Sequence, residues 1–314
     1  MKPLVSRGRG DLVSLTFYER DRPLRAWCPD DEVFTLSREL ILDRVYERGG
    51  VRLAEGMGTV VDAGAHVGIF SLQASRWAER VVALEASRVN YDTLVLNVDR
   101  NHARNVDARH CALWPTSTSA LSFRPRGHSG GGEVLAGGPP GQAAGSGGGT
   151  AGGSADDGLR GGAGAGDELR GGSGDGGGLR GVSLDELVDE LGAIDLLKLD
   201  VEGAEYEVLG RCRQLRRIGA IAGEMHVRDP GERRRLEVLV ATLGAAGFEV
   251  TVVPEADLYA PASLARLRSH AGALVGHGLV KAIAAAYYLA PVAKPLRARG
   301  ASYELPILAA RRAR

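Results

Sequence analysis

The chain has 314 residues, and its 39 Lys and Arg side chains balance 39 Asp and Glu side chains. A composition that is 44% hydrophobic and 25% charged is typical of a globular protein, which excludes wholesale disorder, a collagen and a multi-span membrane protein. The three cysteines are far apart and form no CxxC pair, so neither a disulfide framework nor a zinc site is indicated. The first ten residues carry no signal-peptide pattern, and we expect a cytoplasmic location.

The first half of the chain alternates short apolar strands with amphipathic helices. Residues 1–58 are predicted to form an N-terminal extension that packs on the core. Helices are predicted at Ile69–Arg80 and Arg88–Arg100, where apolar side chains recur on one face. Strands are predicted around these helices at Thr59–Asp62, Val81–Glu85, Val106–Ala112 and, as a short strand, Ser119–Phe123.

A Gly-rich tract follows, since 25 of the 45 glycines lie between Gly127 and Gly181. The tract has almost no large apolar side chains, so it cannot bury enough apolar surface to offset the entropy of ordering its glycines. We therefore predict a flexible insertion over residues 127–181. A repeat solenoid or a glycine-rich nucleic-acid segment is the alternative, which three Leu-Arg-Gly copies and six acids against three Arg disfavour.

After the tract the alternation of helices and strands resumes. Ser183–Leu191 is predicted to be a helix with a capping box formed by Ser183 and Glu186. The remaining predictions are strands at Ile194–Asp200, Ile218–Glu224, Phe248–Val253 and Tyr303–Ala309, and helices at Ala204–Arg211 and Gly231–Ala246. The pattern predicts an α/β fold with a mostly parallel sheet covered by helices on both faces. Its core domain would comprise residues 59–126 and 182–256.

The C-terminal part of the chain is basic, with nine Lys and Arg against two acids from Asp257 onward. We predict a helical insertion that covers the active site over residues 257–301, and a final strand with a basic tail over residues 302–314. The apolar stretch at 273–293 consists mainly of Ala and Gly and has Lys281 near its centre, which disfavours a transmembrane helix. Contact of this segment with a membrane surface is the alternative.

The ends of the predicted strands carry the chemistry, because ligands of parallel sheets bind beyond the carboxyl ends of the strands. Asp62 begins a D-x-G-x-x-x-G turn in which Gly64 permits a tight bend and Gly68 allows the helix to pack closely on the strand. A ligand can then approach the backbone N–H groups at the helix N-terminus. Glu85 ends the next strand, where a carboxylate can accept both hydroxyls of a ribose.

The turn does not match the dinucleotide fingerprint G-x-G-x-x-G, because no glycine stands between Gly64 and Gly68. It suits a cofactor that has no pyrophosphate and whose ammonium group faces the acid side of the turn. That cofactor is S-adenosylmethionine. A nicotinamide-dependent oxidoreductase is the alternative enzyme.

Several motifs in this sequence resemble the FkbM family of class I S-adenosylmethionine-dependent methyltransferases. They lie at residues 60–71, 82–97 and 182–187, and the most specific runs from Ile194 through the string D-V-E-G-A-E at 200–205, followed by Glu224-Met225-His226. The resemblance covers about half of the chain. It implies a Rossmann-like seven-stranded methyltransferase sheet with its last strand antiparallel, and methyl transfer, usually to an oxygen of a natural product or sugar.

The chain departs from the family in three respects. His66 stands where Asn is more common, and Ala86 stands where Pro is more common. The Gly-rich tract replaces a short connection that can lie near the substrate.

On this basis we assign two groups of site residues. The residues expected to bind the cofactor are Asp62, Gly64, His66, Gly68, Glu85, Asn97 and Ala112. The catalytic candidates Asp200, Glu224 and His226 lie at the ends of adjacent strands, where one of them could remove the proton of a hydroxyl acceptor. A metal ion held by these three is disfavoured, because they show no ligand-spacing signature.

The acceptor is expected to be a small hydroxylated molecule, with no nucleic-acid partner. A non-enzymatic binding protein that uses the Gly-rich tract and the basic C-terminus is the remaining alternative.

Overall fold

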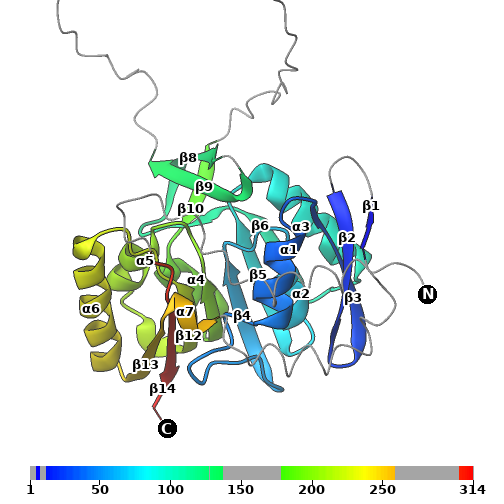
Figure 1. Cartoon of the computed structure of the whole chain (residues 1–314). Coiled ribbons are helices and arrows are strands. Elements are labelled where there is room, and N and C mark those ends of the chain that lie inside the picture. The colour runs from blue at the N-terminus through cyan, green and yellow to red at the C-terminus, as the bar shows by residue number, and fades with distance from the viewer. Residues whose placement is uncertain (1–4, 8–11, 127, 137–177, 259–303, 314) are drawn as a thin grey trace, which may run out of the picture.

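The computed structural model describes residues 5–7, 12–126, 128–136, 178–258 and 304–313 (Figure 1). Its centre is a seven-stranded sheet in the order β13-β14-β12-β11-β4-β5-β6. The strands are β4 (Met57–Ala63), β5 (Ala78–Glu85), β6 (Val106–His110), β11 (Ile194–Leu199), β12 (Ile218–Glu224), β13 (Phe248–Val253) and β14 (Ile307–Arg312). Only β14 runs antiparallel to its neighbours. The predicted mostly parallel sheet with an antiparallel last strand is confirmed.

Alternate side chains of each strand point to opposite faces of this sheet, as the period of two requires. Val61 and Leu197 join one apolar core, whereas their neighbours Val60 and Leu196 join another. The first core contains side chains of α4 (Leu184–Leu191), α5 (Glu205–Arg211) and α6 (Pro230–Ala245). The second contains side chains of α2 (Ile69–Ala74), and α3 (Arg88–Arg100) packs beside β5 through Leu94. Helices thus cover both faces.

The N-terminal residues form a separate antiparallel sheet of β1 (Val5–Arg7), β2 (Leu12–Glu19) and β3 (Arg22–Pro29). Side chains of β2 and β3 share an apolar core with Ile69 and Leu72 of α2. The chain then passes through α1 (Val33–Leu36) and the π-helix η1 (Ser37–Leu42) on its way to β4. In Figure 1, α1 lies beside α2 and α3.

A third sheet lies next to the carboxyl ends of the central strands and appears at the top of Figure 1. Its order is β7-β10-β8-β9, from β7 (Ala112–Leu113), β10 (Leu179–Val182), β8 (Thr118–Arg126) and β9 (His128–Ala136). The predicted strand Val106–Ala112 is therefore wrong at its end, because the chain leaves the central sheet at Cys111. The predicted short strand Ser119–Phe123 is part of the longer β8.

The Gly-rich tract does not begin and end where the sequence placed it. Strand β9 occupies residues 128–136 and β10 begins at Leu179, so both ends of residues 127–181 are paired strands. The reason is tertiary: β8 offers both of its edges, and backbone hydrogen bonds do not require large side chains. Residues 137–177 lie outside the described residues.

The ends of the other predicted helices and strands shift by no more than the length of one helical turn, with two larger differences. The helix predicted to reach Arg80 ends at Ala74, and the last strand begins at Ile307 instead of Tyr303. The predicted C-terminal helical insertion over 257–301 lies almost wholly outside the described residues, which contain only its residues 257 and 258, at the end of α7 (Glu255–Leu258). None of the helices within the described ranges has the length and apolar character that a bilayer crossing requires.

The predicted capping box at α4 is modified by a third residue. Ser183 caps the helix by accepting the Glu186 N–H at 3.2 Å. The reciprocal contact runs through Ser117, whose hydroxyl accepts the Ser183 N–H and donates to the Glu186 carboxylate. This relay joins the loop before β8 to the start of α4.

Candidate active site

A cavity of about 670 Å³ opens at the carboxyl ends of β4, β5, β11 and β12. Its walls also include residues of α1, η1, β8 and β9. The cavity lies where the strand ends predict it. Of the ten sequence-predicted site residues, seven line it, namely Gly64, His66, Glu85, Ala112, Asp200, Glu224 and His226.

The turn after β4 has no room for a side chain at either of its two glycines. Gly64 has a φ of +75°, and a Cβ on it would lie 1.7 Å from the Asp200 carbonyl oxygen. Gly68 has a φ of +85°, and a Cβ there would lie 2.3 Å from Leu94 of α3. Gly68 therefore serves the contact between α2 and α3 and not, as predicted, the packing of a helix on the strand.

Glu85 ends β5 with its carboxylate held by two backbone donors. Its Oε2 accepts the N–H of His66 and its Oε1 accepts the N–H of Ser87, both at 2.8 Å. Burial raises the pKa of Glu85 above its ordinary value, although His66 and the backbone donors act in the opposite direction. The side chain is thus fixed at the rim of the glycine turn.

His66 itself is held in the left-handed region, with a φ of +52°. Its Nε2 lies 3.1 Å from Oε2 of Glu32, which precedes α1. A residue of the N-terminal segment therefore supports the turn residue that holds Glu85.

Asp62 and Lys198 form a buried pair beneath the turn. Asp62 is 0% exposed, accepts a hydrogen bond from Ser71 at 2.6 Å and lies 3.3 Å from the Lys198 ammonium. Lys198 also donates to the Gly64 carbonyl at 2.5 Å. Burial alone would lower the pKa of Lys198, but Asp62 and Asp200 raise it above its usual value. Asp62 does not line the cavity, so its side chain supports the turn instead of facing a ligand.

Asn97 likewise serves the fold. Its amide donates to the carbonyls of Trp27 and Val67, and its oxygen accepts the Trp27 N–H. The residue ties α3 to β3 and to the glycine turn, and it does not reach the cavity. Asp62, Gly68 and Asn97 are therefore not among the cavity-lining residues, and the contacts that the structure shows for them support the turn and its neighbours.

Ala112 begins an apolar wall of the cavity. The described residues that share this wall are Leu84, Ala86, Cys111, Leu113, Phe123 and Val134. Phe123 and Val134 come from β8 and β9, which the sequence did not connect with the site. Gly132 of β9 is required there, because a Cβ on it would lie 2.1 Å from the Phe123 ring.

His226 is enclosed by two acids of the D-V-E-G-A-E string. Its Nδ1 lies 3.2 Å from Glu205 and its Nε2 lies 3.4 Å from Glu202. Burial would lower its pKa, but the two carboxylates raise the pKa of His226 to about 10. The ring therefore holds its proton at neutral pH and is unsuited to act as a base.

The D-V-E-G-A-E string forms a tight loop that accounts for the spacing of its acids. Glu202 and Gly203 have φ values of +58° and +110°, which form a tight loop after β11. Glu205 is fully buried and accepts the N–H groups of Val201 and Gly203 at 3.2 and 3.0 Å. Its contact with His226 then joins this loop to the loop after β12.

Glu224 lies at the end of β12 beside Asp200. Burial, Asp200 and Glu39 raise the pKa of Glu224 well above its ordinary value. Asp200, Glu224 and His226 do not converge on a metal position, and the described residues contain no group of three or more ligand side chains arranged to hold one.

The N-terminal segment contributes cavity residues that no sequence pattern predicts. Glu32, Glu39 and Tyr46 line the cavity, and the Tyr46 hydroxyl donates to Oδ2 of Asp200 at 2.8 Å. Tyr46 and Asp200 are separated by 154 positions, and no local pattern marks such a pair. Asn90 of α3 also lines the cavity.

The sheet order and the site at its carboxyl edge define a Rossmann-like α/β protein. Comparison with protein families narrows the class, because the model of the methyltransferase FkbM domain matches residues 62–250. The match covers more than half of the chain, which belongs to this family. No curated protein sequence matches the chain.

Solved structures of methyltransferases are among those similar to the chain. Methyltransferase FkbM from Methylobacillus flagellatus KT is 15% identical, with a TM-score of 0.39 over 67% of this chain and 44% of that protein. Precorrin-6y C5,15-methyltransferase from Geobacter metallireducens GS-15 is 15% identical, with a TM-score of 0.34 over 65% and 69%. An rRNA methylase from Streptococcus thermophilus is 9% identical, with a TM-score of 0.38 over 83% and 90%. The chain therefore spans less than half of the first of these proteins.

Proposed function

We propose that this protein is an S-adenosylmethionine-dependent methyltransferase that transfers a methyl group to a hydroxyl oxygen of a small molecule. The observation that carries the proposal is the fixed carboxylate of Glu85 beside the glycine turn. Its two oxygens are anchored by backbone N–H groups and it faces the cavity. A carboxylate at this strand end is suited to the two hydroxyls of a ribose.

The other residues of the cavity fit the same cofactor. The bare backbone at Gly64 leaves space that a Cβ would fill. The apolar wall around Ala112 suits a purine ring, because flat apolar ligands bind where little polar surface must be dehydrated. The cavity volume of about 670 Å³ is in the range of small-molecule sites.

When bound, the cofactor supplies a methyl group on a positively charged sulfur. The residues of this chain must then align the acceptor and remove its proton. Alignment of two reactants can contribute roughly 7–11 kcal/mol in favourable cases.

Glu224 is the residue best suited to take the acceptor proton. It lines the cavity at the end of β12 beside Asp200, and its raised pKa makes the ionised form a stronger base than an ordinary carboxylate. General base catalysis contributes roughly 10²- to 10⁴-fold. His226 suits this role less well, because the two carboxylates beside it raise its pKa to about 10.

The test of the cofactor is isothermal titration with S-adenosylhomocysteine. We expect the wild type to bind and Glu85→Ala to bind at least tenfold more weakly, because the ribose hydroxyls lose their charged acceptor. Glu79→Ala is the matched control, since Glu79 lies exposed on the same strand. Equal affinity of Glu85→Ala and wild type, or binding of NAD in place of S-adenosylhomocysteine, would contradict the proposal.

A further inference from the structure

Two carboxylates and one ammonium lie beneath the glycine turn, so one negative charge is not balanced within this group. Asp62, Lys198 and Asp200 lie within 3.7 Å of one another through the lysine ammonium, and their formal charges sum to −1. Asp62 is 0% exposed and Lys198 is 5% exposed, whereas Asp200 is 27% exposed and lines the cavity. The excess negative charge is therefore presented to the cavity by Asp200.

Asp200 is also fixed against the cofactor turn. Its N–H donates to the Ala63 carbonyl at 3.0 Å, and its own carbonyl lies where a Cβ of Gly64 would be. A ligand bound against Gly64 would thus have its cationic group close to Asp200. The turn motif predicts that this ammonium faces the acid preceding the turn, Asp62, but the fold buries Asp62 against Lys198.

Tyr46 determines how Asp200 is oriented. Its hydroxyl donates to Oδ2 of Asp200 at 2.8 Å, the same oxygen that faces Lys198 at 3.7 Å. Among the described residues, no side chain makes a hydrogen bond or ion pair with Oδ1, so the two contacts hold one oxygen and leave the other for a ligand.

The Tyr46 ring is itself fixed in place. It packs edge-on against Phe70 of α2 with ring centroids 5.9 Å apart, and the Lys198 ammonium lies 5.0 Å from its centroid. The residue lies outside the matched family region 62–250, so the N-terminal segment supplies it.

We propose that Tyr46 is a positioning residue that holds Asp200 to receive the ammonium of the cofactor's amino-acid group. This inference rests on the proposed function. A hydrogen bond from a rigid, buried donor restricts the carboxylate to one rotamer, which lowers the entropy lost when the ligand binds.

The test compares two ligands that differ only in the amino-acid group. S-adenosylhomocysteine carries it, whereas 5′-deoxy-5′-methylthioadenosine has the same nucleoside and sulfur but lacks it. We expect Tyr46→Phe to weaken binding of S-adenosylhomocysteine about three- to tenfold in isothermal titration and to leave binding of methylthioadenosine within about twofold of wild type. Tyr18→Phe is the matched control, because Tyr18 lies exposed on β2.

A double-mutant cycle identifies Asp200 as the intermediary. Asp200→Asn should weaken the binding of S-adenosylhomocysteine more than Tyr46→Phe does. Adding Tyr46→Phe to Asp200→Asn should cause no further loss of affinity. Equal weakening of both ligands by Tyr46→Phe would show a merely structural role, and unchanged affinity for both would also overturn the inference. A wild type that binds neither ligand would instead refute the proposed function.

Discussion

At the scale of single residues, Glu224 at the end of β12 and His226 just beyond it both have raised pKa values, but Glu224 is neutral and His226 is positively charged when it holds its proton. Glu224 faces carboxylates, whose negative charge opposes its ionisation. His226 lies two positions later between Glu202 and Glu205, whose charges favour its cation. Both are candidate bases by residue type, and of the two we propose Glu224 for this role.

The ionisation of Glu224 has a consequence for stability. Because its folded-state pKa is raised above the unfolded value, its contribution to stability is fully present below the unfolded pKa and is lost as pH rises through the folded pKa. Glu224→Gln removes this ionisation. We therefore expect the variant to gain stability relative to wild type at pH 8 and to lose that advantage below about pH 4.5.

Chemical denaturation at both pH values measures the difference in unfolding free energy between Glu224→Gln and wild type. Glu237→Gln is the control, because Glu237 is exposed on α6. With a hydroxylated acceptor found by screening, Glu224→Gln should also lower the transfer rate by roughly 10²- to 10⁴-fold. A variant that keeps the wild-type rate would remove Glu224 as the base.

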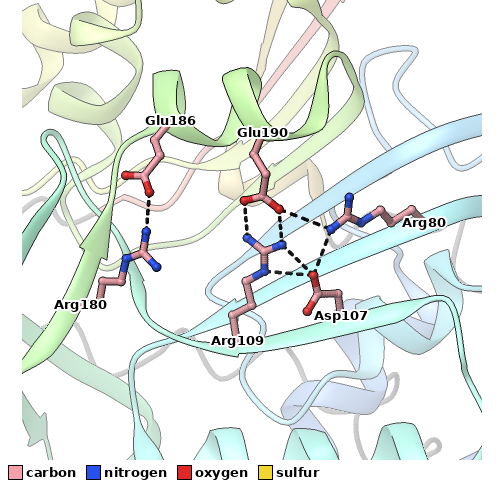
Figure 2. Close-up of polar contacts among 6 residues, drawn as sticks. All are labelled: Arg80, Asp107, Arg109, Arg180, Glu186 and Glu190. Carbon is pink, nitrogen blue, oxygen red and sulfur yellow. Dashed lines mark hydrogen bonds and ion pairs between the residues drawn. The ribbon is translucent and has the colours of Figure 1, made fainter. Parts of the chain in front are cut away.

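At the scale of elements, an ion-pair network joins the edge of the central sheet to α4 (Figure 2). Glu190 of α4 pairs with Arg109 of β6 at 2.6 Å and with Arg80 of β5 at 3.4 Å. Asp107 completes the network by pairing with both arginines at 2.7 and 3.1 Å. Figure 2 shows Arg109 between the two acids, and a separate pair of Arg180 with Glu186 beside them.

The network and the separate pair offer a matched comparison. Arg109→Gln should destabilise the protein by roughly 1–2 kcal/mol, because Arg109 is 24% exposed and bonds two carboxylates. Arg180→Gln should cost less than about 0.5 kcal/mol, because Arg180 is 64% exposed and pairs with one. Urea denaturation at low and high salt checks both values. Equal effects of the two variants, or an Arg109 effect that 1 M NaCl does not reduce, would contradict this view.

Elements with strong local signals were predicted closely. Helix α3 and strands β12 and β13 have the predicted bounds, since apolar periodicity and turn residues mark them. Strands β9 and β10 were not predicted, because Gly-rich segments carry no side-chain pattern and pair only through backbone groups that β8 provides.

At the scale of the whole molecule, residues 137–177 can be tested by replacement. Ala136 and Leu179 both pair with Leu121, one on each side of it, so they lie about two strand spacings, or roughly 10 Å, apart. A Gly-Ser linker of about six residues spans this distance. We expect the replaced protein to bind S-adenosylhomocysteine with unchanged affinity, because the linker preserves the pairing of β8 with β9 and β10, and β8 and β9 supply Phe123 and Val134 to the cavity wall.

Its stability should be unchanged or higher by up to about 2 kcal/mol, because a shorter loop loses less entropy on closure. Titration and thermal denaturation measure the two quantities. Loss of cofactor binding would show that the segment contributes to the site.

The sequence by itself determined the strands of the central sheet, the main helices between them, the glycine turn and the strand-end acids, because these depend on local periodicity and on the backbone freedom of Gly64. Only the tertiary structure decided which acids face the cavity. Asp62 and Asp200 end adjacent strands, yet Lys198 and Ser71 bury one and Tyr46 orients the other. Burial and the distances between charges arise from residues far apart in the chain, and they set the roles that residue type leaves open.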